Sequence, residues 1–202
     1  MKRTAFALIF ACCTLAMMAQ DGIKVNYKGA KPTISDFAWA LFAAIDEDEE
    51  ESGDRPAYAI REAMIRQRNG LPQDEGVTLI VDEKNGYILY EWLYESYVIR
   101  MEMCYWNEAD GKHKLFAFNN LASYDTADGR PLLTETSDLS FFRYNNATKK
   151  MTYCDPPGFE VQYADASYAL PRTGKDITVK KWNKDGTTTK KKLKWNGRRF
   201  TK

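Results

Sequence analysis

His113 is the only histidine in this 202-residue chain, so any chemistry that needs an imidazole must use it. A single histidine excludes a multi-histidine metal site. His113 follows a predicted turn, and folding that turn into a hairpin brings it toward Cys104, so a thiol–imidazole pair can be drawn. Cys104 falls in the middle of a predicted strand, however, whereas a nucleophilic cysteine needs partial exposure and a lowered pKa. We therefore interpret His113 as a surface residue and assign no catalytic residue.

Cys104 and Cys154 are the cysteines that remain if an N-terminal signal containing Cys12 and Cys13 is removed. In an exported protein, such a pair favours a disulfide. The bridge would close a loop of about 50 residues and add about 2–4 kcal/mol, provided that the two Cα atoms lie within about 7 Å. The alternative is a pair of buried free thiols that pack as small hydrophobic side chains. The sequence leaves both possibilities open.

Acidic residues are too numerous, at 28, for the sequence to single out a catalytic pair. The Asp-Gly turns at 110–111, 128–129 and 185–186 lack the alternating acids of a calcium loop, and turns prefer these residues for conformational reasons alone. The acidic run 46–51 is interpreted as a solvated loop rather than a cation site. We predict neither a metal nor a cofactor.

The C-terminal segment 172–202 is the most distinctive charged region, with twelve basic residues against two acids. Alternate lysines in its predicted strand would place three ammonium groups on one face, where an acidic glycan or envelope component could bind through charge. Nucleic acid is not expected. The same pattern can be explained without a ligand, as an edge strand whose lysines prevent aggregation. The pattern alone favours this second explanation. The candidate polyanion-binding residues are Lys190, Lys192, Lys194, Arg198 and Arg199.

Aromatic residues make up 13% of the chain, and aromatic rings can stack on sugar faces. Trp92, Trp106 and Trp182 are the candidates for stacking on a ligand. Strands and cores also use aromatic residues, and packing is the favoured explanation for them.

The N-terminus has the pattern of a secretory signal: Lys2 and Arg3, an apolar run to Met18, and the small residue Ala19 before polar residues. The run is shorter than the roughly 20 residues of a membrane-spanning helix. We therefore predict removal of residues 1–19 and export to the periplasm or beyond, with no transmembrane segment in the mature chain. Lipid attachment at Cys12 is an alternative, which bulky Phe10 disfavours. Residues 20–202 then form a single domain with 27 basic and 28 acidic residues.

Two helices are predicted within residues 32–70. The first has apolar residues at helical spacing after Thr33, and Thr33 with Asp36 gives a T-x-x-D start signal. The second has Pro56 in its first turn and stops at Asn69-Gly70.

From Val77 onward the apolar period changes to two, and turn signals separate successive hairpins. In the segment 97–106, for example, Ile99, Met101 and Met103 fall on one face, whereas Arg100, Glu102 and Cys104 fall on the other. The class predicted is therefore α+β, with two N-terminal helices packed on a meandering antiparallel sheet of about seven to nine strands within residues 77–202.

Three segments, 85–88 (NGYI), 102–107 (EMCYWN) and 141–146 (FFRYNN), resemble uncharacterised secreted proteins of Bacteroidetes bacteria. The resemblance covers the central half of the chain. It implies kinship and export, but these are strand and turn residues, so it assigns no site.

The function expected from these patterns is that of an exported, non-enzymatic binding or accessory module. One alternative is a hydrolase that acts on envelope material or glycans through paired carboxylates. Another is a structural subunit of a surface assembly. A concave cleft with two acids of displaced pKa would favour the hydrolase, and a filled sheet interior would favour the other two.

Overall fold

The computed structural model describes residues 22–46, 56–94, 97–124, 136–159, 166–183 and 187–202. The predicted signal, the acidic residues 47–51, and the turns at 128–129 and 185–186 lie outside these ranges. The described residues form two helices and two antiparallel sheets of seven and four strands, which confirms the α+β class.

Both helices begin and end at the signals that the sequence contains. Before α2 (Ile34–Asp46), the backbone amide of Thr33 donates to the carboxylate of Asp36 at 2.7 Å, and the amide of Asp36 approaches Thr33 Oγ1 at 3.4 Å, the reciprocal pattern of a capping box. After α3 (Pro56–Arg68), Gly70 adopts a φ of 68°, and the amide of Leu71 donates to the carbonyl of Arg66 at 2.9 Å. This left-handed glycine ends the helix.

The large sheet is a meander in which six consecutive strands pair with their chain neighbours, and the N-terminal strand pairs with the last of them. Its order is β1-β7-β6-β5-β4-β3-β2, so the two-residue β1 is an edge strand. The strands are β1 (Ile23–Lys24), β2 (Val77–Asp82), β3 (Tyr87–Tyr94), β4 (Tyr97–Asn107), β5 (His113–Tyr124), β6 (Thr136–Asn145) and β7 (Lys150–Tyr153).

The remaining strands form a separate small sheet of order β11-β10-β9-β8. They are β8 (Ala166–Ala169), β9 (Asp176–Trp182), β10 (Thr188–Trp195) and β11 (Phe200–Thr201). This division corrects the expectation of one meandering layer. No pattern in the sequence predicts β8, whose four residues are too few to show a period.

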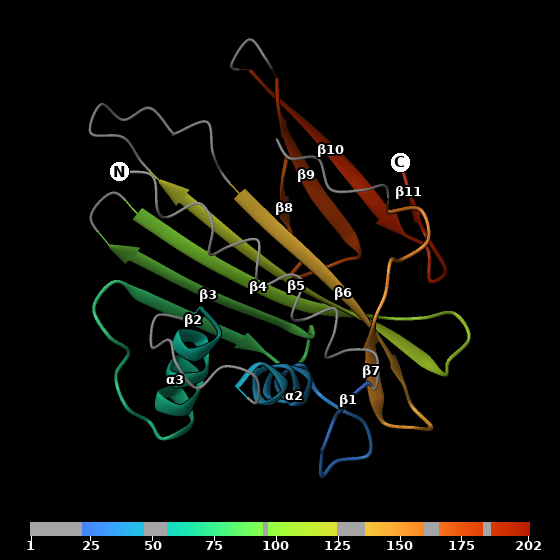
Figure 1. The fold of residues 1–202 in the computed structure, drawn as a ribbon, viewed down its shortest axis with the longest axis horizontal. Helices are drawn as coiled ribbons and strands as arrows, with labels where there is room; N and C mark the ends of the chain where they lie inside the picture. Colours follow the sequence, from blue (N-terminus) through green and yellow to red (C-terminus); the bar gives the residue numbers. More distant parts are fainter. Residues whose placement is uncertain (1–21, 47–55, 95–96, 125–135, 160–165, 184–186) are drawn as a thin grey trace.

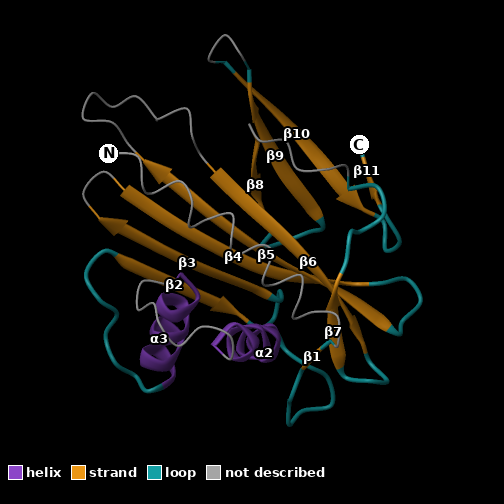
Figure 2. Ribbon diagram, viewed as in Figure 1, coloured by secondary structure: helices purple, strands orange, loops and turns teal. Residues whose placement is uncertain are grey.

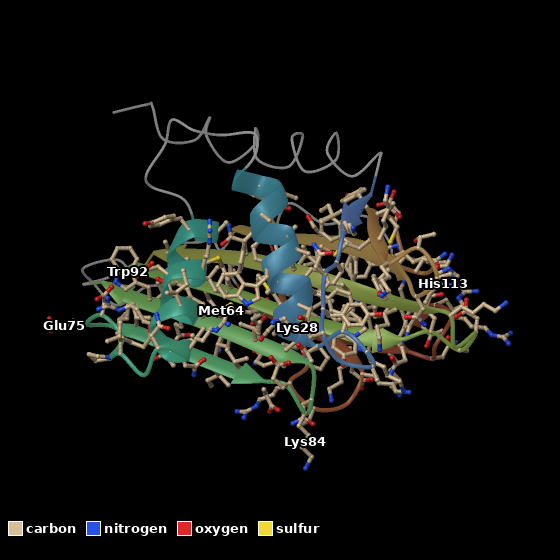
Figure 3. All side chains as sticks on the ribbon, turned by 90° about the horizontal axis from the view of Figure 1, so that it is seen from below. Lys28, Met64, Glu75, Lys84, Trp92 and His113 are labelled. Carbon is tan, nitrogen blue, oxygen red and sulfur yellow. The ribbon has the colours of Figure 1, made fainter. Side chains whose placement is uncertain are left out.

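The molecule has three layers, with the large sheet in the middle. The helices cover one face of the large sheet, as Figure 3 shows, and the small sheet lies on the other side (Figure 1 and Figure 2). The first core joins the helices to the sheet through residues such as Phe37, Leu41, Met101 and Met103, all 0% exposed. The predicted alternation in β4 is therefore confirmed.

The second core lies between the two sheets and includes Cys104, Trp106, Phe141, Ile177 and Phe200. The small sheet covers part of the face of β4 that carries Arg100, Glu102 and Cys104, a face that the sequence alone would assign to solvent: Glu102 and Cys104 are buried, whereas the Arg100 side chain is 39% exposed. Within the described ranges, neither helix has the length and apolar character needed to span a membrane.

Candidate functional site

The predicted basic face lies on the outside of the small sheet. Lys190, Lys192 and Lys194 are all exposed, whereas Leu193 and Trp195 of the same strand pack into the second core. Side chains of a strand alternate between faces, so the three lysines point away from the core. Pairing with β9 places Lys180 opposite Lys190 and Asp176 opposite Lys194.

The same strand is also exposed at its edge. Among the described residues, β11 pairs only with Lys194 and Trp195, so residues 188–193 of β10 have a strand partner on the β9 side alone. The structure therefore contains both features that the sequence suggested: a lysine face that could hold an anion and an edge strand that carries lysines.

Arg198 and Arg199 lie in the turn between β10 and β11, and both are exposed. The Oδ1 atom of Asn196 accepts hydrogen bonds from their two backbone amides, each at 2.9 Å. The turn rests on the large sheet, because the amide of Ala109 donates to the carbonyl of Gly197 at 2.8 Å. The arginines therefore lie at the end of the small sheet that contacts the β4–β5 turn.

Two of the three tryptophans proposed for ligand stacking, Trp92 and Trp106, lie on opposite faces of the large sheet. Trp106 is only 4% exposed and packs against Trp195 and Phe200, so its ring serves the second core; this corrects its proposed role. Trp92 is half-buried and packs against the first core, on the opposite face of the large sheet. The side chain of Trp182 lies outside the described part of the structure.

The proposed disulfide is not present, since Cys104 and Cys154 are both free. Register places Cys104 opposite Ala117 and Ala117 opposite Phe141, while the amide of Cys154 donates to the carbonyl of Phe141. Three strand spacings, about 14 Å, therefore separate the cysteines, twice the Cα distance that a disulfide tolerates. Burial raises the pKa of both thiols, that of Cys154 to about 12.

His113 belongs to a charged cluster at the β4–β5 turn. Its Nδ1 atom lies 2.6 Å from Asp110 Oδ2, and Arg143 of β6 bonds to Glu108 through two parallel contacts of 2.7 and 2.6 Å. The Nη2 atom of Arg143 also lies 3.5 Å from Asp110 Oδ2. The cluster thus joins four ionisable side chains from two hairpins.

Hydrogen bonds shift the pKa values of Asp110 and Arg143 in this cluster. The His113 side chain and the amides of Lys112 and His113 lower the pKa of Asp110 from 3.8 to about 2. The hydrogen bond with Glu108 raises the pKa of Arg143 above its usual value. Glu108 and Asp110 therefore form a carboxylate pair, but Arg143 contacts both and holds Glu108 through two bonds, and the hydrolase alternative gains no support here.

The sequence does not single out this cluster, because each member has a simpler explanation there, His113 as a surface residue and Asp110 as a turn residue. The spacing of Glu108, Asp110 and His113 on a hairpin was a signal that could have joined the three, but the approach of Arg143 depends on the pairing of β5 with β6. The drawn dyad of His113 with Cys104 is excluded, because Cys104 pairs with Ala117, about 13 Å along β5 from His113.

A second polar group lies inside the molecule, where Glu102 is 3% exposed. Its carboxylate accepts hydrogen bonds from the Tyr87 hydroxyl at 2.9 Å, the Asn119 amide at 3.3 Å and the Leu170 backbone amide at 3.0 Å. Burial, with the neighbouring Glu102 charge, raises the pKa of Tyr87 well above its usual value. Because the donors come from both sheets, Glu102 is a structural link rather than an open site.

The fold and surface define a three-layer α+β protein with an exposed lysine face and a separate carboxylate–histidine cluster. No family model matches the chain, and neither a curated protein nor a solved structure is significantly similar to it.

Proposed function

We propose that the protein is an exported, non-enzymatic binding module that holds an acidic polymer on the outer face of the small sheet. One observation carries the proposal: Lys190, Lys192 and Lys194 are exposed on the same face of one strand. Alternate residues of a strand are about 6.8 Å apart, so the three lysines span about 14 Å. A chain of repeated anionic groups can contact all three at once, whereas a single small anion cannot.

The strand next to the lysine face carries charges of both signs. Lys180 lies directly opposite Lys190, and Asp176 lies opposite Lys194. Binding would depend on salt, because these charges lie in water, where ions screen them within about 10 Å at 0.1 M.

Chromatography on heparin, a sulfated polysaccharide, tests the proposal. Changing Lys190, Lys192 and Lys194 together to glutamine should weaken binding roughly 3- to 100-fold, at about 0.2–1 kcal/mol for each exposed ion pair. The matched control changes three exposed lysines elsewhere, Lys28, Lys31 and Lys84, and alters net charge equally. Equal loss in both variants, or no loss in the first, would reject the lysine face as the site.

Export is the second part of the proposal and rests on the N-terminal pattern of Lys2, Arg3 and the apolar run to Met18. N-terminal sequencing of the protein from its producing cell should find a chain that begins near Gln20. A chain that retains Met1, or one that begins at a lipidated Cys12, would contradict it.

A further inference from the structure

The cluster at the β4–β5 turn contains three side chains of the types that bind metal ions. One potential ligand atom each from Glu108, Asp110 and His113 lies within 4.8 Å of the others. The turn itself orients Asp110, whose Oδ1 accepts the backbone amides of Lys112 and His113 at 2.8 and 3.0 Å. The other carboxylate oxygen therefore faces the imidazole before any ion arrives.

A cation already occupies the point toward which these atoms converge. The guanidinium of Arg143 reaches both oxygens of Glu108, and its Nη2 lies 3.5 Å from Asp110 Oδ2 and 3.3 Å from His113 Nδ1. The contact between Arg143 and the imidazole limits the hydrogen bonds that His113 can form. The Nδ1 atom cannot donate to Asp110 and accept from Arg143 at the same time, so one of its two short contacts is not a hydrogen bond.

We propose that Glu108, Asp110 and His113 form a binding site for a divalent transition-metal ion, for which Arg143 is an internal competitor. Two carboxylates and one imidazole suit zinc and its neighbours better than calcium or magnesium, which prefer oxygen ligands alone. Replacing one guanidinium charge with a divalent ion changes the formal charge of the cluster by one unit. Three protein ligands leave a fourth position for water or a ligand atom.

Arg143 is able to leave the site. It comes from β6 rather than from the turn that supplies the ligands, and its side chain is 47% exposed, so it can move into solvent while the turn stays in place. Tetrahedral ligands at about 2.1 Å from one ion lie about 3.4 Å apart, so Asp110 Oδ2 and His113 Nδ1, which are 2.6 Å apart, must separate, and Arg143 must release Glu108 before it can join them. Binding through Nδ1 requires the proton of the imidazole to sit on Nε2, and a proton held on Nδ1 passes to solvent or to that nitrogen.

Zinc titration of the tag-free chain tests the site directly, because its one histidine gives a single set of imidazole signals in the NMR spectrum. Zinc should shift these signals saturably in the wild type. In the variant Arg143→Gln, which keeps a polar side chain and removes the competing charge, calorimetry should show one site with at least roughly tenfold higher affinity. Adding His113→Gln to that variant should abolish the site.

Three outcomes would overturn the proposal. The imidazole signals could stay unshifted at millimolar zinc, Arg143→Gln could bind no more tightly than the wild type, or zinc binding could survive loss of His113. Cys154→Ser is the control for zinc held by a thiol and should leave the titration unchanged. If Arg143→Gln fails to fold, as circular dichroism would show, the imidazole titration of the wild type still decides the question.

Discussion

The carboxylate of Glu102 accepts a hydrogen bond from the backbone amide of Leu170 at 3.0 Å, although 68 positions separate the two residues. Glu102 lies in the large sheet, and Leu170 directly follows β8 of the small sheet. Asn119 completes the link, since its side-chain amide donates to Glu102 at 3.3 Å and to the carbonyl of Tyr168 at 2.8 Å. The buried carboxylate of Glu102 thus links the two sheets through hydrogen bonds.

Replacing Glu102 with leucine should lower the free energy of unfolding by about 1–3 kcal/mol or more, because buried donors of Tyr87 and Leu170 would lose their acceptor. Glu102→Gln should cost less, since its amide oxygen can still accept from Leu170. Urea unfolding measures both, with Glu75→Gln at an exposed position as the control. A leucine variant as stable as the wild type would show that the link contributes nothing.

Glycine is required at position 158, where the chain passes against β11. A Cβ atom there would lie 2.1 Å from the carbonyl oxygen of Phe200, and φ is 79°. Gly174 has a similar φ of 85° but nothing within 4 Å of such a Cβ. Gly174→Ala should therefore cost about 1 kcal/mol from backbone strain, and Gly158→Ala a further 1–3 kcal/mol, roughly, from the clash. Equal melting temperatures for the two variants would contradict the close approach.

Asp82 should give the protein a pH-dependent contribution to stability. Hydrogen bonds from Asn85 and then Arg172 lower its pKa from 3.8 to about 2. A carboxyl group whose pKa is lower in the folded than in the unfolded chain stabilises the fold at pH values above its unfolded pKa. This contribution is lost as pH falls from about 4 through about 2. Asp82→Asn should therefore lose less stability than the wild type over that interval.

Carbon NMR of the Asp82 carboxyl tests the cause of this shift. Arg172→Gln should raise its titration midpoint but leave it below 3.8, because the bonds from Asn85 remain. A midpoint that does not move would show that the 2.9 Å contact of Arg172 with Asp82 is not formed in solution.

The two thiols should be present but unreactive in the folded protein. The pKa of Cys104 is raised well above 9 and that of Cys154 to about 12, and the thiolate is the reactive form. A thiol reagent at pH 8 should therefore react slowly with the native chain from Gln20 onward, and with both cysteines once urea unfolds it without reductant. If no thiols were detected in urea, the two cysteines would be joined by a disulfide and this prediction would be wrong.

Local signals in the sequence predicted the elements well. Thr33 and Asp36 mark the start of α2, and Asn69-Gly70 marks the end of α3, because caps and left-handed glycines act within a few residues. The alternation in β4 likewise predicted that Met101 and Met103 face the helices.

The same reasoning could not place the site residues relative to one another. Lysine alternation predicted the exposed face of β10, because exposure of one strand follows from its own period. The burial of Trp106 and Glu102 depends on a second sheet that covers the other face of β4, and no pattern within β4 reveals that cover.

What the sequence determined by itself is the class of fold, the start of α2, the end of α3 and the alternation of side chains along strands such as β4 and β10, since these depend on neighbours along the chain. Only the tertiary structure decided that the strands divide into two sheets, that Cys104 and Cys154 lie three strands apart, and that Arg143 meets Glu108, 35 positions away. The physical reason is that strand order and register are set by packing between segments distant in sequence.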